Sequence, residues 1–229
     1  MRSAKAIFIK QMNDLPKNYS ILIQFILYPV IAFAMTWLMG DQEGADPHMF
    51  IAMFAPIFVG SAPLITVANA IAEDVEHKSL RFLVMAGVKS YQYLLGLAVF
   101  VLIVSIFPIV AFGLIAEYGT MELLRFSGIM LLGTAASIML GAGIGIFSRD
   151  VQQCAAYYTP AYMLLAFLPM MSMFNPMIAR ISQIMFTHQI MEFFVADAEI
   201  LRPLLIILAN IAVLTVFFIV AYRKKGLKG

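Results

Sequence analysis

The densest run of charged residues in this very apolar chain is the stretch EDVEHKSLRFLVMAGVKSY, from Glu73 to Tyr91. Its acidic residues come first, its bases follow, and Gly87 lies near its end. This order favours a short helix, because acids stabilise the positive N-terminal end of a helix, bases stabilise its later turns, and glycine adopts the left-handed position after the last turn. Leu80, Leu83 and Val84 recur at helical spacing and give this helix an apolar face. Such a helix recognises a surface rather than performing a reaction: it either lies solvated on the lipid or docks onto a soluble partner.

Residues that could bind a metal ion or catalyse a reaction are few and scattered. Four of them lie close together and could suggest a cation site: Asp41, Glu43, Asp46 and His48. A solvated loop explains them better, because hard cations need several converging oxygen ligands. The sequence contains no G-x-x-x-x-G-K-[ST] loop for ATP, no H-E-x-x-H metal site and no G-x-S-x-G nucleophile elbow. Cys154 is the only cysteine, so a disulfide framework is excluded, and we expect no catalytic, metal or cofactor site in this chain.

The composition is that of an integral membrane protein. Of the 229 residues, 62% are hydrophobic and 12% are charged, whereas a soluble domain of this size needs far more polar surface. Six stretches without Lys, Arg, Asp or Glu are each near the roughly 20 residues that a helix needs to cross the hydrocarbon core: 18–40, 49–72, 90–116, 126–148, 151–179 and 203–222. They contain no histidine either, which argues against a proton-coupled transporter. We therefore predict an all-α membrane protein with six transmembrane helices over residues 19–229.

Residues 1–18 have the pattern of an amphipathic helix that lies in the membrane interface. One face is apolar and carries Ala4, Ile7, Phe8, Met12 and Leu15. Lysines lie elsewhere around the helix, toward the lipid headgroups. The segment is not a cleavable signal, because no small-residue cleavage pattern follows a short apolar core.

The distribution of basic residues predicts the orientation of the chain. With the N-terminus in the cytoplasm, 12 of the 15 bases lie on the inner side. The three others are Arg125, Arg180 and Arg202. This positive-inside bias predicts a multi-pass protein of the plasma membrane with both termini and the 73–91 stretch in the cytoplasm.

Two further patterns concern packing and the outer side. The fourth stretch carries small residues at every fourth position, Gly133, Ser137, Gly141 and Gly145, a ladder that allows another helix to approach closely unless it is a chance run in a glycine-rich helix. Prolines should kink or locally break several helices: Pro29, Pro56, Pro63, Pro108, Pro160 and Pro169. The outer segment, about 175–201, is too long for a turn and too polar to span, and predicts one or two short helices in the outer leaflet.

The order of these elements resembles a known family, the membrane subunit of ATP-binding cassette (ABC) exporters of the ABC-2 type. The similarity lies in Glu73, Glu76, Ser79-Leu80, Leu83 and Ala86-Gly87-Val88 around the charged stretch, and in the link Ser148-Arg149-Asp150-Val151-Gln152-Gln153 with Ala155. The family usually has Gly before the Ser or Thr and Pro in the turn, whereas this chain has Lys78 and Gly87-Val88.

The resemblance implies a non-catalytic permease that exports its cargo with energy from a separate ATPase. Two permease chains, identical or related, would work with two copies of a cytoplasmic ATPase, which binds the ATP and Mg²⁺. The helix at about 73–88 would be the coupling helix in a groove of that ATPase. The residues it assigns to ATPase coupling are Glu73, Glu76, Ser79, Leu80, Arg81, Leu83 and Gly87, with Leu80, Arg81 and Leu83 as the expected anchors.

Cargo and mechanism are less constrained by the sequence. The 17 methionines offer adaptable apolar surface, which suits a hydrophobic or amphipathic cargo such as a peptide or toxin, a lipid or a drug, although they can simply face lipid and neighbouring helices. Membrane lipid is an expected partner and nucleic acid is not. The alternative from another class is a channel, membrane sensor or assembly protein that works without an ATPase; a membrane enzyme fits less well, because no catalytic constellation is present.

Overall fold

The residues described by the computed structural model are 2–39, 47–85, 87–195 and 201–225, and they form ten α-helices and one 3-10 turn, with no strand among them. Their bounds are α1 Arg2–Asp14, η1 Leu15–Lys17, α2 Tyr19–Met39, α3 Pro47–Glu76, α4 Ser79–Met85, α5 Ser90–Ile115, α6 Thr120–Phe147, α7 Val151–Ser172, α8 Pro176–Ser182, α9 Phe186–Val195 and α10 Leu201–Lys225. Six of these helices (α2, α3, α5, α6, α7 and α10) are long and apolar enough to cross a membrane. The prediction of an all-helical, six-span chain is confirmed at this level.

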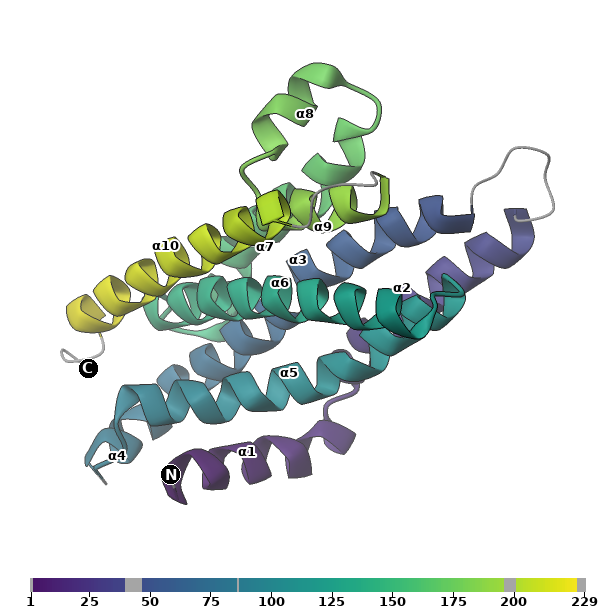
Figure 1. Cartoon of the computed structure of the whole chain (residues 1–229). Coiled ribbons are helices and arrows are strands. Elements are labelled where there is room, and N and C mark those ends of the chain that lie inside the picture. The colour runs from purple at the N-terminus through teal and green to yellow at the C-terminus, as the bar shows by residue number, and fades with distance from the viewer. Residues whose placement is uncertain (1, 40–46, 86, 196–200, 226–229) are drawn as a thin grey trace.

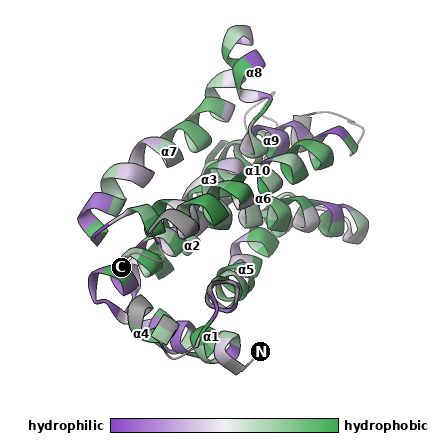
Figure 2. Cartoon of the chain, turned by 90° about the vertical axis from the view of Figure 1, so that its left-hand side faces the viewer, coloured by the Kyte–Doolittle hydropathy of each residue, from purple (hydrophilic) through white to green (hydrophobic). Residues whose placement is uncertain are grey.

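The centre of the bundle is formed by α3 and α6. In their apolar windows 78% and 72% of the residues are buried, against 17% in each of α2, α7 and α10. Figure 1 shows α3 and α6 running through the middle of the molecule, with the other long helices around them. Hydrophobic residues cover most of the long helices, and hydrophilic residues gather at their ends and in the connecting segments (Figure 2). The exposed flanks are therefore apolar, as lipid or another membrane helix requires.

The small-residue ladder of α6 lies at its contact with α3. A Cβ atom on Gly141 would press against the carbonyl oxygen of Leu64, and one on Gly145 would lie 2.8 Å from the carbonyl oxygen of Ala68. Further along the ladder, Ser137 Oγ donates a hydrogen bond of 2.5 Å to the carbonyl oxygen of Val59 in α3. The two backbones approach each other because the ladder carries no bulky side chain.

Proline explains why the Val59 carbonyl needs a partner from another helix. An α-helical carbonyl normally accepts from the amide four residues later, and Pro63 occupies that position without an N–H group. Ser137 supplies the missing donor. All six prolines named above lie inside continuous helices, so the predicted breaks do not occur.

Two helices differ at one end from the charge-free stretches, for identifiable reasons. The fifth span ends at Ser172 rather than 179, because Asn175 adopts an extended conformation before Pro176 and accepts from the Met177 amide to begin α8. The fourth begins at Thr120 rather than 126, because Glu122 caps it by accepting from the Gly119 amide at 3.0 Å.

The two ends of the bundle differ in what they carry. Helices α1 and α4 lie toward one end, and α8 protrudes near the other (Figure 1). α1 packs against α5, where its Ala4 carbonyl lies against Gly96. Ala4 and Ile7 are buried, while Lys5 and Lys10 are exposed, so the apolar face predicted for the N-terminal helix is used against the bundle.

Candidate functional site

The charged stretch is divided between two helices rather than forming one. α3 continues through the acidic residues to Glu76, and α4 begins only at Ser79, after Lys78 adopts a left-handed conformation with φ of 57°. The acids therefore lie in the last turns of α3, not in the first turn of the coupling helix as predicted. The apolar helical run of α3 continues without interruption into these acids. Acidic residues are unfavourable at the negative C-terminal end of a helix, and partners from other helices offset this destabilisation.

Glu76 has such a partner in α7. Its Oε2 accepts a hydrogen bond of 3.1 Å from the Val151 amide, at the first position of α7, where helix amides have no intrahelical acceptor. The carboxylate thus meets the positive N-terminal end of α7, which compensates its place at the end of α3. Asp150 caps the same helix by accepting from the Gln153 amide at 2.6 Å. The predicted coupling residue Glu76 therefore joins the base of α4 to α7.

The end of α4 follows the prediction for Gly87. This glycine has a φ of 79°, and the Val88 amide donates to the Leu83 carbonyl at 3.0 Å. A bond from the third residue after the helix to its third-last residue, around a left-handed glycine, is a Schellman cap. Leu83 and Val88 also line the same cavity, which is the apolar contact that accompanies this cap. α4 is therefore bounded at both ends by left-handed residues.

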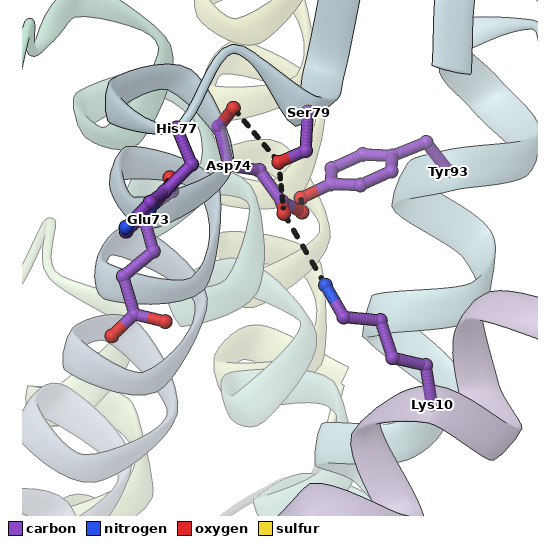
Figure 3. A network of polar contacts seen from close by, with 6 residues as sticks. All are labelled: Lys10, Glu73, Asp74, His77, Ser79 and Tyr93. Carbon is purple, nitrogen blue, oxygen red and sulfur yellow. Dashed lines mark hydrogen bonds and ion pairs between the residues drawn. The ribbon is translucent and has the colours of Figure 1, made fainter. Parts of the chain in front are cut away.

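Asp74 is the centre of a polar network that joins four helices (Figure 3). Its Oδ1 accepts from Ser79 Oγ at 2.8 Å and from Lys10 Nζ at 3.3 Å, and its Oδ2 accepts from Tyr93 Oη at 2.6 Å. The three donors belong to α4, α1 and α5, while Asp74 itself belongs to α3. Asp74 is only 6% exposed, and the ammonium and two hydroxyls give its carboxylate the partners that a buried charge requires.

A cavity of about 600 Å³ lies beside this network, between α1, α4 and α5. Its walls include Ile7 of α1, Leu83 of α4 and Tyr93 of α5. Leu83 is half-buried and packs against the core, so the predicted anchor faces the chain's own bundle.

α4 also carries two exposed apolar residues that the sequence reasoning did not select. Phe82 is 65% exposed and Met85 is 66% exposed. They are three residues apart on the helix, and Phe82 also lines the cavity together with Leu83. Leu80 and Arg81 belong to α4, but their side chains lie outside the described part of the chain. The sequence does contain a signal for Phe82 and Met85, because they form a second pair of apolar residues at helical spacing in this short helix.

The other candidate residues are placed as follows. Glu73 and Glu76 are exposed, and Ser79 is half-buried through its bond to Asp74. Asp41, Glu43 and Asp46 lie outside the described residues, while His48 stacks on Tyr118 with ring centroids 5.8 Å apart. Within the described ranges no group of three or more His, Cys, Asp or Glu residues could hold a metal ion. The sequence did not predict the polar network of Lys10, Asp74 and Tyr93, because no local pattern in the sequence relates these residues.

A scan of the chain against protein-family models finds no match, and a search of curated proteins finds no relative.

Proposed function

We propose that this chain is the membrane-spanning permease subunit of an ABC exporter, which couples ATP hydrolysis by a separate cytoplasmic ATPase to the export of a hydrophobic or amphipathic cargo. The observation that carries the proposal is α4, a seven-residue helix at one end of the bundle that exposes Phe82 and Met85 and is tied at its base to other helices. A solvated loop needs neither an apolar outward face nor a buried anchoring carboxylate.

The network around α4 provides a route by which a pull on this helix reaches the spans. Ser79 connects α4 to Asp74, and through Asp74 to α1, α3 and α5. Glu76 connects the same corner to α7. Closure of two ATPase subunits on ATP would move α4, and these contacts would tilt the attached helices as rigid bodies. The chain itself supplies no chemistry in this scheme.

The flanks of the bundle suit a second permease chain, identical or related, and lipid around the assembly. Helices α2, α7 and α10 have few buried residues in the single chain. On α7 the exposed side chains include Tyr157, Met163, Phe167 and Met171, which are apolar and adaptable. A path between two such chains accommodates a peptide or toxin, a lipid or a lipophilic drug better than a small hydrophilic ion. The excess of basic residues on the side of α4 favours a plasma-membrane protein with both termini in the cytoplasm.

The proposal is tested with the double variant Phe82→Ala/Met85→Ala. The native chain should co-purify with an ATPase that mass spectrometry identifies by its P-loop, and cargo should stimulate ATP hydrolysis by the complex in lipid nanodiscs. Removal of both anchors should weaken co-purification at least tenfold, because exposed aromatic and Met side chains commonly dominate such interfaces at about 1–2 kcal/mol each.

The matched control is Met177→Ala/Ile184→Ala, which removes two exposed apolar side chains near the opposite end of the bundle. This control should bind the ATPase like the native chain. Equal binding by both double variants would contradict docking through α4. Absence of any ATPase partner would favour the alternative, a channel, sensor or assembly protein.

A further inference from the structure

Helix α9 (Phe186–Val195) is packed into the bundle instead of lying over it. A Cβ atom on Gly60, near the middle of α3, would lie 3.2 Å from Thr187 Cγ2, and one on Gly133 of α6 would press against Ile190. The residues from Phe186 to Met191 are all buried, and α9 contacts α3, α6, α7 and α10. This short helix therefore brings its polar residues into contact with the long apolar helices.

His188 is the polar centre of α9 and is 3% exposed. Its Nδ1 lies 3.2 Å from Ser172 Oγ and 3.1 Å from Ser182 Oγ, and its Nε2 lies 3.3 Å from Glu192 Oε1. Ser172 is the last residue of α7 and Ser182 the last residue of α8. The imidazole thus joins the ends of two helices to a third.

Hydrogen bonding around His188 can be complete in both of its protonation states. In the neutral ring Nε2–H donates to Glu192, and Nδ1 accepts from one serine hydroxyl. In the charged ring both nitrogens donate, and Ser172 and Ser182 can accept because each hydroxyl has a carbonyl within reach for its own hydrogen, Pro169 O and Ala179 O. Neither state leaves an unpaired buried atom, which distinguishes this ring from one that serves as a fixed structural contact.

The charge balance around the ring opposes protonation in the packed state. Burial lowers the pKa of His188 below its usual 6.5 and Arg202 lowers it further, while Glu192 partly offsets both effects. Glu192 is on α9 itself and Arg202 is at the start of α10. α7 has no charged residue. α3 carries His48 near its start and its acids near its end, α6 carries Glu122 and Arg125 in its first turns, α8 carries Arg180, and α10 carries further bases in its last turn, Arg223, Lys224 and Lys225. Glu192 is 29% exposed and gives a proton a way in from water.

We propose that His188 and Glu192 form a proton-binding site, and that protonation of His188 favours release of α9 from its buried position between α3, α6 and α7. This site does not depend on an ATPase or on the coupling role of α4. Because the pKa is lower in the packed state, packing is favoured above about pH 6.5 and loses stability as the pH falls below that value. The chain would then respond to acidification on the side opposite α4.

The test measures access to α9 through a cysteine. In a Cys154→Ala background, Met191→Cys is placed at a buried position of α9, and Met177→Cys at an exposed position of α8 serves as the reference for the pH dependence of thiol reactivity. The rate of maleimide labelling of each variant is measured in nanodiscs. The rate for Met191→Cys divided by the rate for Met177→Cys should rise up to about tenfold as the pH is lowered from about 7.5 to about 5.5, since one pKa unit corresponds to a tenfold change in proton binding.

His188→Gln, which keeps a hydrogen-bonding side chain without a titrating ring, should abolish this rise. A flat ratio in the native background, or an equal rise with His188→Gln, would overturn the proposal. A second measurement does not depend on that variant folding: histidine NMR in a His48→Gln/His77→Gln background follows His188 directly. Its apparent pKa should lie below 6.5 and fall further with Glu192→Gln; an unperturbed, Glu192-independent pKa would refute the site.

Discussion

Asp74 shows how one side chain can hold a corner of a membrane protein together. Its three donors lie 64, 5 and 19 residues away in the chain and come from three different helices. Asp14 offers a contrast, because its ion pair with Lys17 is long, at 3.9 Å, and both side chains are exposed. A buried carboxylate with three donors contributes to stability, whereas an exposed ion pair contributes little.

Asp74→Ala should therefore destabilise the α1–α4–α5 corner by about 1–3 kcal/mol, because Tyr93 Oη is left buried without its acceptor. The expected result is a lower temperature of thermal unfolding in detergent and faster hydrogen exchange of the α4 amides. Asp14→Ala is the matched control and should change neither quantity. Unchanged exchange of α4 in Asp74→Ala would mean that the carboxylate does not anchor this helix.

At the scale of elements, the contact between α3 and α6 is set by where side chains are missing. Gly141 and Gly145 meet backbone atoms of α3, which cannot move aside as a flexible side chain can. Gly128 lies in the same helix α6 but has open space around its Cα. These two environments predict opposite outcomes for the same substitution.

Gly141→Ala should cost about 1–3 kcal/mol through overpacking against Leu64, and reduce the yield of monodisperse protein. Gly128→Ala should leave the yield unchanged or improve it, because alanine favours a helix by up to about 1 kcal/mol over glycine. Fluorescence-detected size-exclusion chromatography and thermal unfolding measure both effects. If the two variants behave alike, close packing along this ladder is not what holds α3 to α6.

At the scale of the whole molecule, the bundle is polar at its ends and apolar along its flanks. α1, α4 and the ends of α3 and α10 gather basic and acidic residues at one end, and α8 lies near the other (Figure 1). The surplus of bases on the α4 side predicts which end faces the cytoplasm.

Cysteines placed at Thr120 and Met177, in a Cys154→Ala background, should react with a membrane-impermeant maleimide in intact cells. A cysteine placed at Lys78 should react only after the cells are made permeable. Both Thr120 and Lys78 are exposed in the single chain, so a difference between them reports the side of the membrane. Labelling of Lys78→Cys from outside would reverse the proposed orientation.

Much of this architecture follows from the sequence, because its causes are local. A hydrocarbon layer requires long uncharged helical runs, and the six predicted stretches correspond to α2, α3, α5, α6, α7 and α10. Gly87 ends α4 because a left-handed position favours a residue without Cβ. Asn175-Pro176 contains the signal for the start of α8, since asparagine can cap a helix and proline fits its first position.

Only the tertiary structure decided which polar residues meet. The amide of Val151 lies 75 residues from Glu76, and nothing in either segment specifies that the N-terminal end of α7 will neutralise the acid at the end of α3. The outer segment was predicted to be helical, yet the burial of His188 depends on the space that small residues of α3 and α6, such as Gly60 and Gly133, leave for α9. Periodicity determines which face of a helix is apolar, whereas the packing of several helices determines which of those faces stay exposed and which ionisable groups lose water.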